Sequence, residues 1–176
     1  MGSDADNPRG PTRRRRGGTG DEPDGLLQPQ LFSGVRTASY LTSSAQITLG
    51  CAYPLALGAK MATPRRAVVS LSGDGGFLYN AQEMATAVQN SIGAIAVVFN
   101  DNAYGNVLRA QLEQFGGNVI GTRLHNPDFV DLAESFGMRA QRVDGATELG
   151  DALTQAIGED APALIEVPVN MMDREY

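Results

Sequence analysis

The sequence predicts an α/β fold, with a mostly parallel sheet covered by helices on both faces. Short apolar runs alternate with segments of helical length, and two of these runs end in turns rich in glycine, asparagine and aspartate. With 176 residues, of which 42% are hydrophobic, the chain is long enough to bury one core. We expect one folded domain over residues 31–176, after a Gly/Pro/Arg-rich tail over residues 1–30 that lacks hydrophobic periodicity and is predicted to be disordered.

Strands and helices are expected to alternate along this domain. The strands are predicted at residues 38–41, 67–71, 94–99, 140–143 and 163–167, and the helices at residues 52–61, 80–90, 106–114, 127–136 and 146–157. Asn80 followed by Glu83 has the spacing of a helix cap with its reciprocal glutamate. The run Asn126-Pro127-Asp128 is typical of an N-cap, a proline in the first turn and an acid. Gly93 and Gly137 are expected where the chain leaves a helix.

Charge and composition argue against nucleic-acid and membrane partners. The formal net charge is −6, and five arginines in residues 1–30, four of them in the run 13–16, are balanced by five acids there, so the excess acid lies on the body. No stretch approaches the roughly 20 apolar residues of a membrane helix, and no apolar secretory signal is visible, so a cytoplasmic location is expected. The single cysteine, Cys51, excludes a disulfide within the chain and is expected to be a small buried residue.

Two aspartates stand out as candidate ligands. Asp74 lies in Gly73-Asp74-Gly75-Gly76 after one apolar run, and Asp101 follows Asn100 after the next. Because parallel strands end at one edge of a sheet, both acids are expected at the edge where such sheets bind ligands. The glycines could let backbone N–H groups approach a phosphate, and the carboxylates suit Mg²⁺, although the same residues also suit an ordinary tight turn.

Other phosphate and metal motifs fail on inspection. A dinucleotide fingerprint needs glycine where the chain has Leu78, and a P-loop needs Gly-Lys-Ser/Thr, whereas the only lysine, Lys60, lies between Ala59 and Met61. One cysteine and one histidine do not make a zinc site. A site for Mg²⁺ and diphosphate remains.

These residues resemble a known family: the chain is similar to the diphosphate-binding domain of thiamine-diphosphate-dependent enzymes of the acetolactate synthase and 2-oxo acid decarboxylase type. The family signature, Gly-Asp-Gly followed about two dozen residues later by an Asn pair, appears here as Gly73-Asp74-Gly75 and Asn100-Asp101. The resemblance runs from about residue 41 through Gly58-Ala59-Lys60 to the segment 162–168. It implies thiamine diphosphate and Mg²⁺ as cofactors, and lyase or transferase chemistry on a 2-oxo acid.

The resemblance also implies roles for individual residues. The metal ligands would be Asp74, Asp101 and the backbone carbonyl of Ala103. The diphosphate would contact Gly73, Gly75, Gly76, Tyr104 and Gly105. In the segment Ile47-Thr48-Leu49, Leu49 would wedge the cofactor into a bent shape, and the carbonyl of Ile47 would accept a hydrogen bond from its aminopyrimidine.

The chain departs from the family pattern in two ways. Asp101 stands where the usual second metal ligand is Asn, which adds a negative charge beside a diphosphate. In addition, the first strand and helix of the domain cannot be read upstream of residue 41, so the chain looks like a fragment or a small subunit. The resemblance implies a pyrimidine-binding domain on another chain, a homo- or hetero-oligomer, and little activity alone. The alternatives are a non-catalytic fragment or interaction module that keeps the fold, and a mononucleotide-binding α/β domain.

Several residues also have ordinary structural interpretations. Leu49 could belong to the core, Glu83 is expected in a cap, and His125 is expected at the start of a helix. Arg109 and Arg123 either line the mouth of the site or are solvated.

Overall fold

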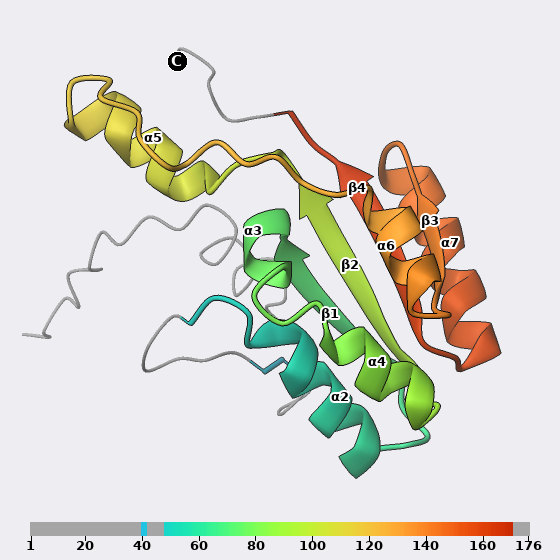
Figure 1. Cartoon of the computed structure of the whole chain (residues 1–176). Coiled ribbons are helices and arrows are strands. Elements are labelled where there is room, and N and C mark those ends of the chain that lie inside the picture. Colours follow the sequence, from blue (N-terminus) through green and yellow to red (C-terminus); the bar gives the residue numbers. More distant parts are fainter. Residues whose placement is uncertain (1–39, 42–47, 171–176) are drawn as a thin grey trace, which may run out of the picture.

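The structure is a computed structural model of the chain and describes residues 40–41 and 48–170. Its described part alternates strands and helices along the chain (Figure 1). The elements are α2 (Ala52–Ala62), β1 (Val68–Gly73), α3 (Asp74–Phe77), α4 (Glu83–Gln89), β2 (Ala94–Asn100), α5 (Gly105–Gln114), α6 (Phe129–Ser135), β3 (Arg139–Arg142), α7 (Ala146–Glu159) and β4 (Ala163–Pro168). No helix among the described residues is long and apolar enough to cross a membrane.

The four strands form one parallel sheet in the order β1-β2-β4-β3. Near the carboxyl ends of the strands, Gly73 of β1 is paired with Phe99 of β2, and Phe99 is paired with Val167 of β4. The carboxyl ends of these three strands therefore lie at one edge, with α3 and α5 beginning beside it (Figure 1). The predicted α/β class with a parallel sheet is confirmed.

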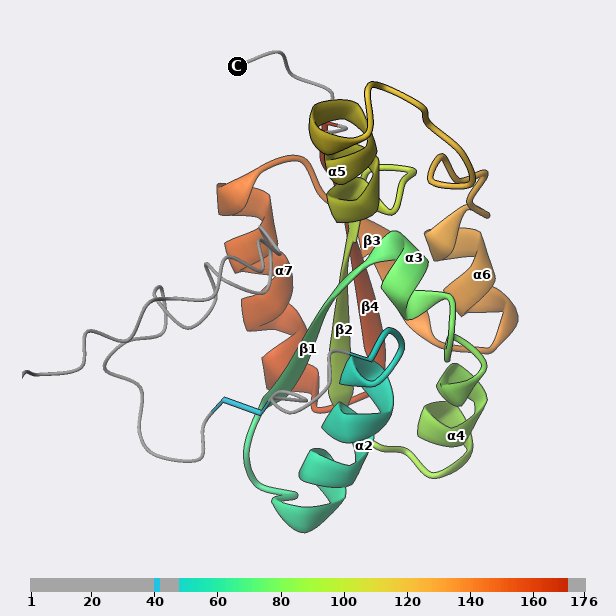
Figure 2. The same cartoon turned by 90° about the vertical axis from the view of Figure 1, so that its left-hand side faces the viewer.

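Helices cover both faces of the sheet (Figure 2). On one face, α2, α3, α4 and α6 pack on the strands through Tyr53, Leu57, Phe77, Met84 and Phe129, all buried. On the other face α7 packs on β2 and β4; this second cluster contains Ala152, Ala156, Ile95, Val97, Ile165 and Val167. Strands β2 and β4 are buried along most of their length because both of their faces are covered, as in other parallel sheets.

Strand β1 is less well covered than its neighbours. Among the described residues it pairs only with β2, so it is an edge strand there. Val69 lies in register with Ile95, and aligned residues of parallel strands point to the same face, the one on which α7 packs. Ile95 is 1% exposed, but Val69 is 37% exposed, because α7 covers β2 and β4 rather than β1. The sheet formed by the described residues thus ends at an apolar strand.

The predicted start of α4 is wrong. The helix begins at Glu83, and its N-cap position is held by Gln82 without a side-chain cap hydrogen bond. Asn80 instead donates its side-chain N–H to the carbonyl of Gly50, 2.9 Å away, and the carboxylate of Glu83 accepts from Thr86. The side chain of Asn80, which the local pattern assigned to the helix cap, therefore forms a hydrogen bond with a residue thirty positions earlier instead.

The predicted start of α6 is two residues too early. Asp128, not Asn126, is the N-cap, and its carboxylate accepts from the backbone N–H groups of Val130 and Asp131. Pro127 therefore precedes the cap rather than opening the helix. This shift frees the side chain of Asn126 for the contacts described below.

Three smaller expectations had different outcomes. Gly137 has φ of +79° just after α6, as predicted for a helix end. Gly93 has no such φ; it is needed because a Cβ there would lie 2.5 Å from the carbonyl oxygen of Asp160, in the turn before β4. Cys51 is only partly buried, at the start of α2. Tyr40 and Leu41 are in no strand, and the rest of the strand predicted at residues 38–41 lies outside the described residues, as does the tail over residues 1–30.

Candidate functional site

Asp74 is a buried carboxylate directly after β1. It is 1% exposed and is the first residue of α3. Its Oδ1 accepts the N–H of Gly75 at 2.8 Å, and its Oδ2 accepts the side-chain N–H of Asn126 at 2.5 Å. Within the described part of the chain Asp74 forms no ion pair. A buried carboxylate is stable only when it is well hydrogen-bonded or paired with a cation, so this position suits a metal ion.

Asp101 lies in the turn after β2, the strand next to β1. Its Oδ1 accepts the N–H of Ala103 at 3.0 Å, and Asn102 between them has φ of +56°. A Cβ on Gly105 would lie 2.6 Å from Oδ2 of Asp101, so only glycine allows this carboxylate to approach the start of α5. The structure therefore places both predicted aspartates after adjoining strand ends.

Ala103 is held in place by the segment that precedes α6. It is 3% exposed and forms an isolated antiparallel bridge with Arg123. The N–H of Tyr104 donates to Thr122, and the N–H of Leu124 donates to Asn102. The turn that carries Asp101 is thus braced by backbone hydrogen bonds to residues about twenty positions later.

The glycines after β1 allow two side chains to approach the backbone. A Cβ on Gly75 would lie 2.5 Å from Cε1 of Tyr104, and one on Gly76 would lie 3.7 Å from Cδ2 of Leu49. Tyr104 also hydrogen-bonds Tyr79, which raises the pKa of Tyr104 above its usual value. Leu49 is 48% exposed, so the alternative that it is a core residue is wrong. Tyr104 therefore lies against Gly75, and Leu49 lies against the next residue, Gly76.

Most of the other predicted residues lie around this turn. Gly73 ends β1 and Gly105 begins α5. Thr48 is exposed and its carbonyl accepts the N–H of Cys51, whereas Ile47 lies outside the described residues. His125 is exposed and donates or accepts in none of the hydrogen bonds around Asp74.

Asn126 is the residue that sequence reasoning missed. Its Nδ2 donates to Oδ2 of Asp74 and, at 2.9 Å, to Oδ1 of Asn100. Its own Oδ1 is buried and has no hydrogen-bond partner among the described residues. The only available signal was the choice between Asn126 and Asp128 as the cap of α6, because the residue not used as a cap is free for another contact.

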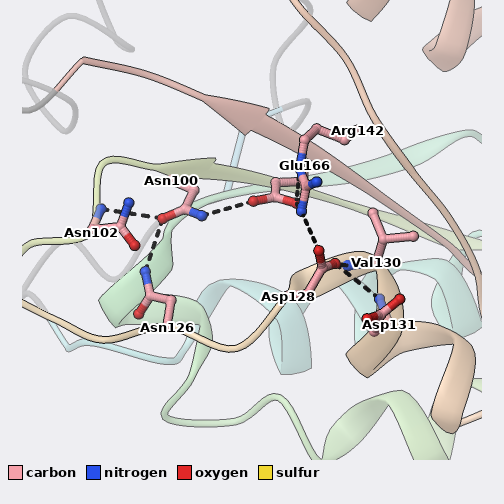
Figure 3. Close-up of polar contacts among 8 residues, drawn as sticks. All are labelled: Asn100, Asn102, Asn126, Asp128, Val130, Asp131, Arg142 and Glu166. Carbon is pink, nitrogen blue, oxygen red and sulfur yellow. Dashed lines mark hydrogen bonds and ion pairs between the residues drawn. The ribbon is translucent and has the colours of Figure 1, made fainter.

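A chain of polar contacts continues from Asn126 into the sheet (Figure 3). Asn100 donates its Nδ2 to Oε1 of Glu166 at 2.7 Å, and its Oδ1 also accepts the N–H of Asn102. Glu166, in β4, is 2% exposed, and its Oε2 accepts a hydrogen bond from Nε of Arg142 at 2.8 Å. Arg142 also bonds Asp128, the cap of α6, at 2.7 Å. The contacts therefore join α3, β2, β4 and β3 with the N-cap of α6 at the candidate site.

The residues present fit a magnesium ion with a diphosphate. Mg²⁺ takes one or two carboxylates and completes its shell with phosphate oxygens and water, so it does not need a large cluster of acids. In the described part of the chain no group of three or more His, Cys, Asp or Glu residues could hold a metal. The buried carboxylate of Asp74, beside the unpartnered oxygen of Asn126, matches such a mixed site.

Comparison with known proteins finds that the chain is similar to acetolactate synthases. The chain is 37% identical over 148 residues to acetolactate synthase of Bacillus subtilis (strain 168), which covers 84% of the chain and 26% of the relative. It is also 37% identical over 133 residues to a probable acetolactate synthase large subunit of Methanocaldococcus jannaschii, covering 75% of the chain and 22% of the relative. The chain thus spans about a quarter of the length of these relatives.

A solved structure supports the same relationship. The thiamine diphosphate-dependent 4-hydroxybenzoylformate decarboxylase of Rhodococcus jostii RHA1 superposes with a TM-score of 0.67 at 34% identity, covering 72% of this chain and 24% of that chain. The sequence model of the family described as "Thiamine pyrophosphate enzyme, C-terminal TPP binding domain" matches residues 25–167. The chain therefore belongs to the thiamine pyrophosphate enzyme family, as a C-terminal domain that binds thiamine pyrophosphate.

Proposed function

We propose that the chain binds thiamine diphosphate through Mg²⁺ and supports decarboxylation or carboligation of 2-oxo acids together with a pyrimidine-binding domain on another chain. The observation that carries this proposal is Asp74, a carboxylate that is 1% exposed and lacks an ion-pair partner among the described residues. A divalent cation supplies the positive charge that a carboxylate in this environment requires. Family membership makes thiamine diphosphate the ligand that brings the remaining oxygens.

The proposed metal ligands are the carboxylates of Asp74 and Asp101 and the backbone carbonyl of Ala103. In the structure Oδ1 of Asp74, which we assign to the metal, accepts a hydrogen bond from the N–H of Gly75, which we assign to the diphosphate. A cation at Oδ1 would withdraw that acceptor and leave the N–H of Gly75 for a phosphate oxygen. Gly73, Gly76, Tyr104 and Gly105 would contact the same diphosphate.

Leu49 and Ile47 are proposed to act on the other half of the cofactor. Leu49 projects partly into solvent beside Gly76, where an apolar side chain could support a bent cofactor. The carbonyl of Ile47 would accept a hydrogen bond from the aminopyrimidine. The bound cofactor supplies the carbanion chemistry needed on a 2-oxo acid, and the protein supplies binding and orientation.

We propose that the whole activity also needs a pyrimidine-binding domain, contributed by another chain in a homo- or hetero-oligomer. The chain spans about a quarter of the length of the matched relatives. We also propose that the assembly works in the cytoplasm, and that the chain alone is weakly active or silent.

A thermal-shift titration of the full chain tests cofactor binding. Adding MgCl₂ with thiamine diphosphate should raise the Tm, because a ligand at 100 times its Kd stabilises a folded protein by about 2.7 kcal/mol. Asp74→Ala should abolish this rise, whereas Asp151→Ala, which removes an exposed carboxylate of α7, should retain it.

The alternatives predict different results. A fragment or interaction module that keeps only the fold would give no rise in the parent protein. A mononucleotide-binding domain would respond to ATP or NAD at least as strongly as to thiamine diphosphate in the same titration. Either result would remove the proposed function.

A further inference from the structure

Asn126 is connected to two buried carboxylates, that of Asp74 at the start of α3 and that of Glu166 in β4. It contacts Asp74 directly and reaches Glu166 through Asn100. We propose that Asn126 is a positioning residue, which holds the carboxylate of Asp74 so that a single oxygen is presented to the metal and thereby favours Mg²⁺ over Ca²⁺. This inference rests on the proposed function, because it assigns a role to a residue at that site.

Donor and acceptor chemistry fixes which way each amide in this chain of contacts points. Glu166 can only accept as a carboxylate, so Asn100 must present Nδ2 to it and turn Oδ1 toward Asn126. Asn126 must then donate to Asn100, and the second hydrogen of the same Nδ2 meets Oδ2 of Asp74. The orientation set in the sheet by Glu166 is therefore transmitted to the carboxylate of Asp74.

The backbone around Asn126 is held on both sides. Before it, the N–H of Leu124 donates to the carbonyl of Asn102 at 2.7 Å. After it, Asp128 caps α6 and pairs with Arg142, which also bonds Glu166. Pro127, with its fixed φ, separates Asn126 from this cap. The backbone on either side of Asn126 is thus held by the turn after β2, by α6 and by β3. The position of its side chain therefore does not depend on its own loop alone.

Occupation of Oδ2 by Asn126 has a consequence for the metal. In the structure each oxygen of Asp74 accepts one hydrogen bond, Oδ1 from the N–H of Gly75 and Oδ2 from Asn126. When the N–H of Gly75 turns to the diphosphate, as proposed above, Oδ1 becomes available to a cation while Asn126 still holds Oδ2, so the carboxylate binds through one oxygen. Mg²⁺ requires a near-ideal octahedron, whereas Ca²⁺ accepts more ligands, including carboxylates that bind through both oxygens. Without Asn126, the carboxylate of Asp74 is free to offer both oxygens, which suits Ca²⁺ better than Mg²⁺.

The test compares two cations with the full chain at a fixed concentration of thiamine diphosphate. The readout is the concentration of MgCl₂ or CaCl₂ that gives half of the rise in Tm. In Asn126→Ala the MgCl₂ midpoint should increase about 10-fold or more, as is typical for loss of a group that orients a metal ligand. The CaCl₂ midpoint should increase less than about threefold, because Ca²⁺ tolerates the altered geometry. Asn90→Ala is the control, since Asn90 is exposed and its side chain donates to the carbonyl of Thr86 one turn earlier, in α4, away from Asp74.

A purely structural role for Asn126 would weaken both cations equally and overturn the inference, as would unchanged midpoints. A parent protein that responds to neither cation overturns the inference and the proposed function together, whereas a normal parent with an unselective effect of Asn126→Ala overturns the inference alone. If Asn126→Ala gives no cooperative melting, Asn126→Leu decides the question. It keeps the approximate size and shape of the side chain but has no hydrogen-bond donor for Asp74, so the Mg²⁺ preference should fall, and a retained preference contradicts the role.

Discussion

Gly75 is the residue of the site at which one added methyl group has the largest steric effect. A Cβ there would lie 2.5 Å from Cε1 of Tyr104 and 3.0 Å from Cδ1 of Leu124. Both contacts are with side chains, so they can shift, but Tyr104 would have to leave the glycine turn and its hydrogen bond with Tyr79. The position thus links the glycine motif to the turn after β2.

We predict that Gly75→Ala lowers the free energy of unfolding by about 1–3 kcal/mol, the usual cost of forcing extra volume into a packed site. Urea unfolding of the ligand-free chain measures this change. Gly76→Ala is the matched control, because its Cβ would lie at an ordinary 3.7 Å from Leu49. Equal stability of the two variants would show that Tyr104 does not restrict Gly75.

At the residue scale, the sequence located the two aspartates but not Asn126. Asp74 and Asp101 could be predicted because each lies within three residues of the end of an apolar run, and parallel strands all end at the same edge of the sheet. The contacts of Asn126 depend on the path of the segment between α5 and α6, which no local pattern specifies. Its local pattern also matched a helix N-cap. Because that interpretation already gave Asn126 a role, the sequence offered no reason to look for another.

Among the elements, α6 is tied to the sheet by a charged side chain. Arg142 of β3 bonds both the buried Glu166 of β4 and the exposed Asp128 at the start of α6. The hydrogen bond from Arg142 lowers the pKa of Asp128 below its usual 3.8, and the N–H of Asp131 adds to this effect. A carboxyl group whose pKa is lower in the folded state stabilises the fold when it is ionised.

We predict that the contribution of Asp128 to stability is fully present above pH 3.8, its usual pKa, and is lost as the pH falls through the lower pKa of the folded state. Asp128→Asn can still cap α6 but cannot form the ion pair. The difference in unfolding free energy between parent and variant, measured by urea unfolding from pH 7 down to pH 3, should therefore shrink toward the acid end. A difference that does not change with pH would contradict this assignment.

Element positions were predicted better than element starts. Helices α2, α5 and α7 and all four described strands lie where the periodicity placed them, because burial of an apolar face determines them over many residues. The starts of α4 and α6 were wrong because Asn80 and Asn126 make contacts with distant segments. A polar side chain that caps a helix in isolation is available for tertiary hydrogen bonds once the chain is compact.

For the whole molecule, the fold class followed from the alternation of elements, but the strand order β1-β2-β4-β3 did not. Alternation predicts parallel strands without stating which ones are neighbours, since each crossover can skip a position. The division of the whole chain into a tail and a domain starting at residue 31 stays a prediction.

We predict that mixing the chain with a separately produced pyrimidine-binding domain, Mg²⁺ and thiamine diphosphate yields release of CO₂ from at least one of a panel of 2-oxo acids. The expected rate exceeds that of the chain alone, because the proposed active site is shared between two domains. The same mixture with Asp74→Ala is the control and should be inactive. Equal rates with and without the second domain would contradict the need for a partner.

The position of β1 at the margin of the described sheet has a consequence for handling the protein. Among residues 40–41 and 48–170, β1 has a partner strand on one side only, so its outer N–H and C=O groups are unpaired within that part of the chain, and Val69 adds exposed apolar surface. Such a strand is a template on which another extended chain can continue the sheet, and sulfate or phosphate salts strengthen apolar association further. Concentrated stocks in those salts are therefore where self-association and precipitation would begin.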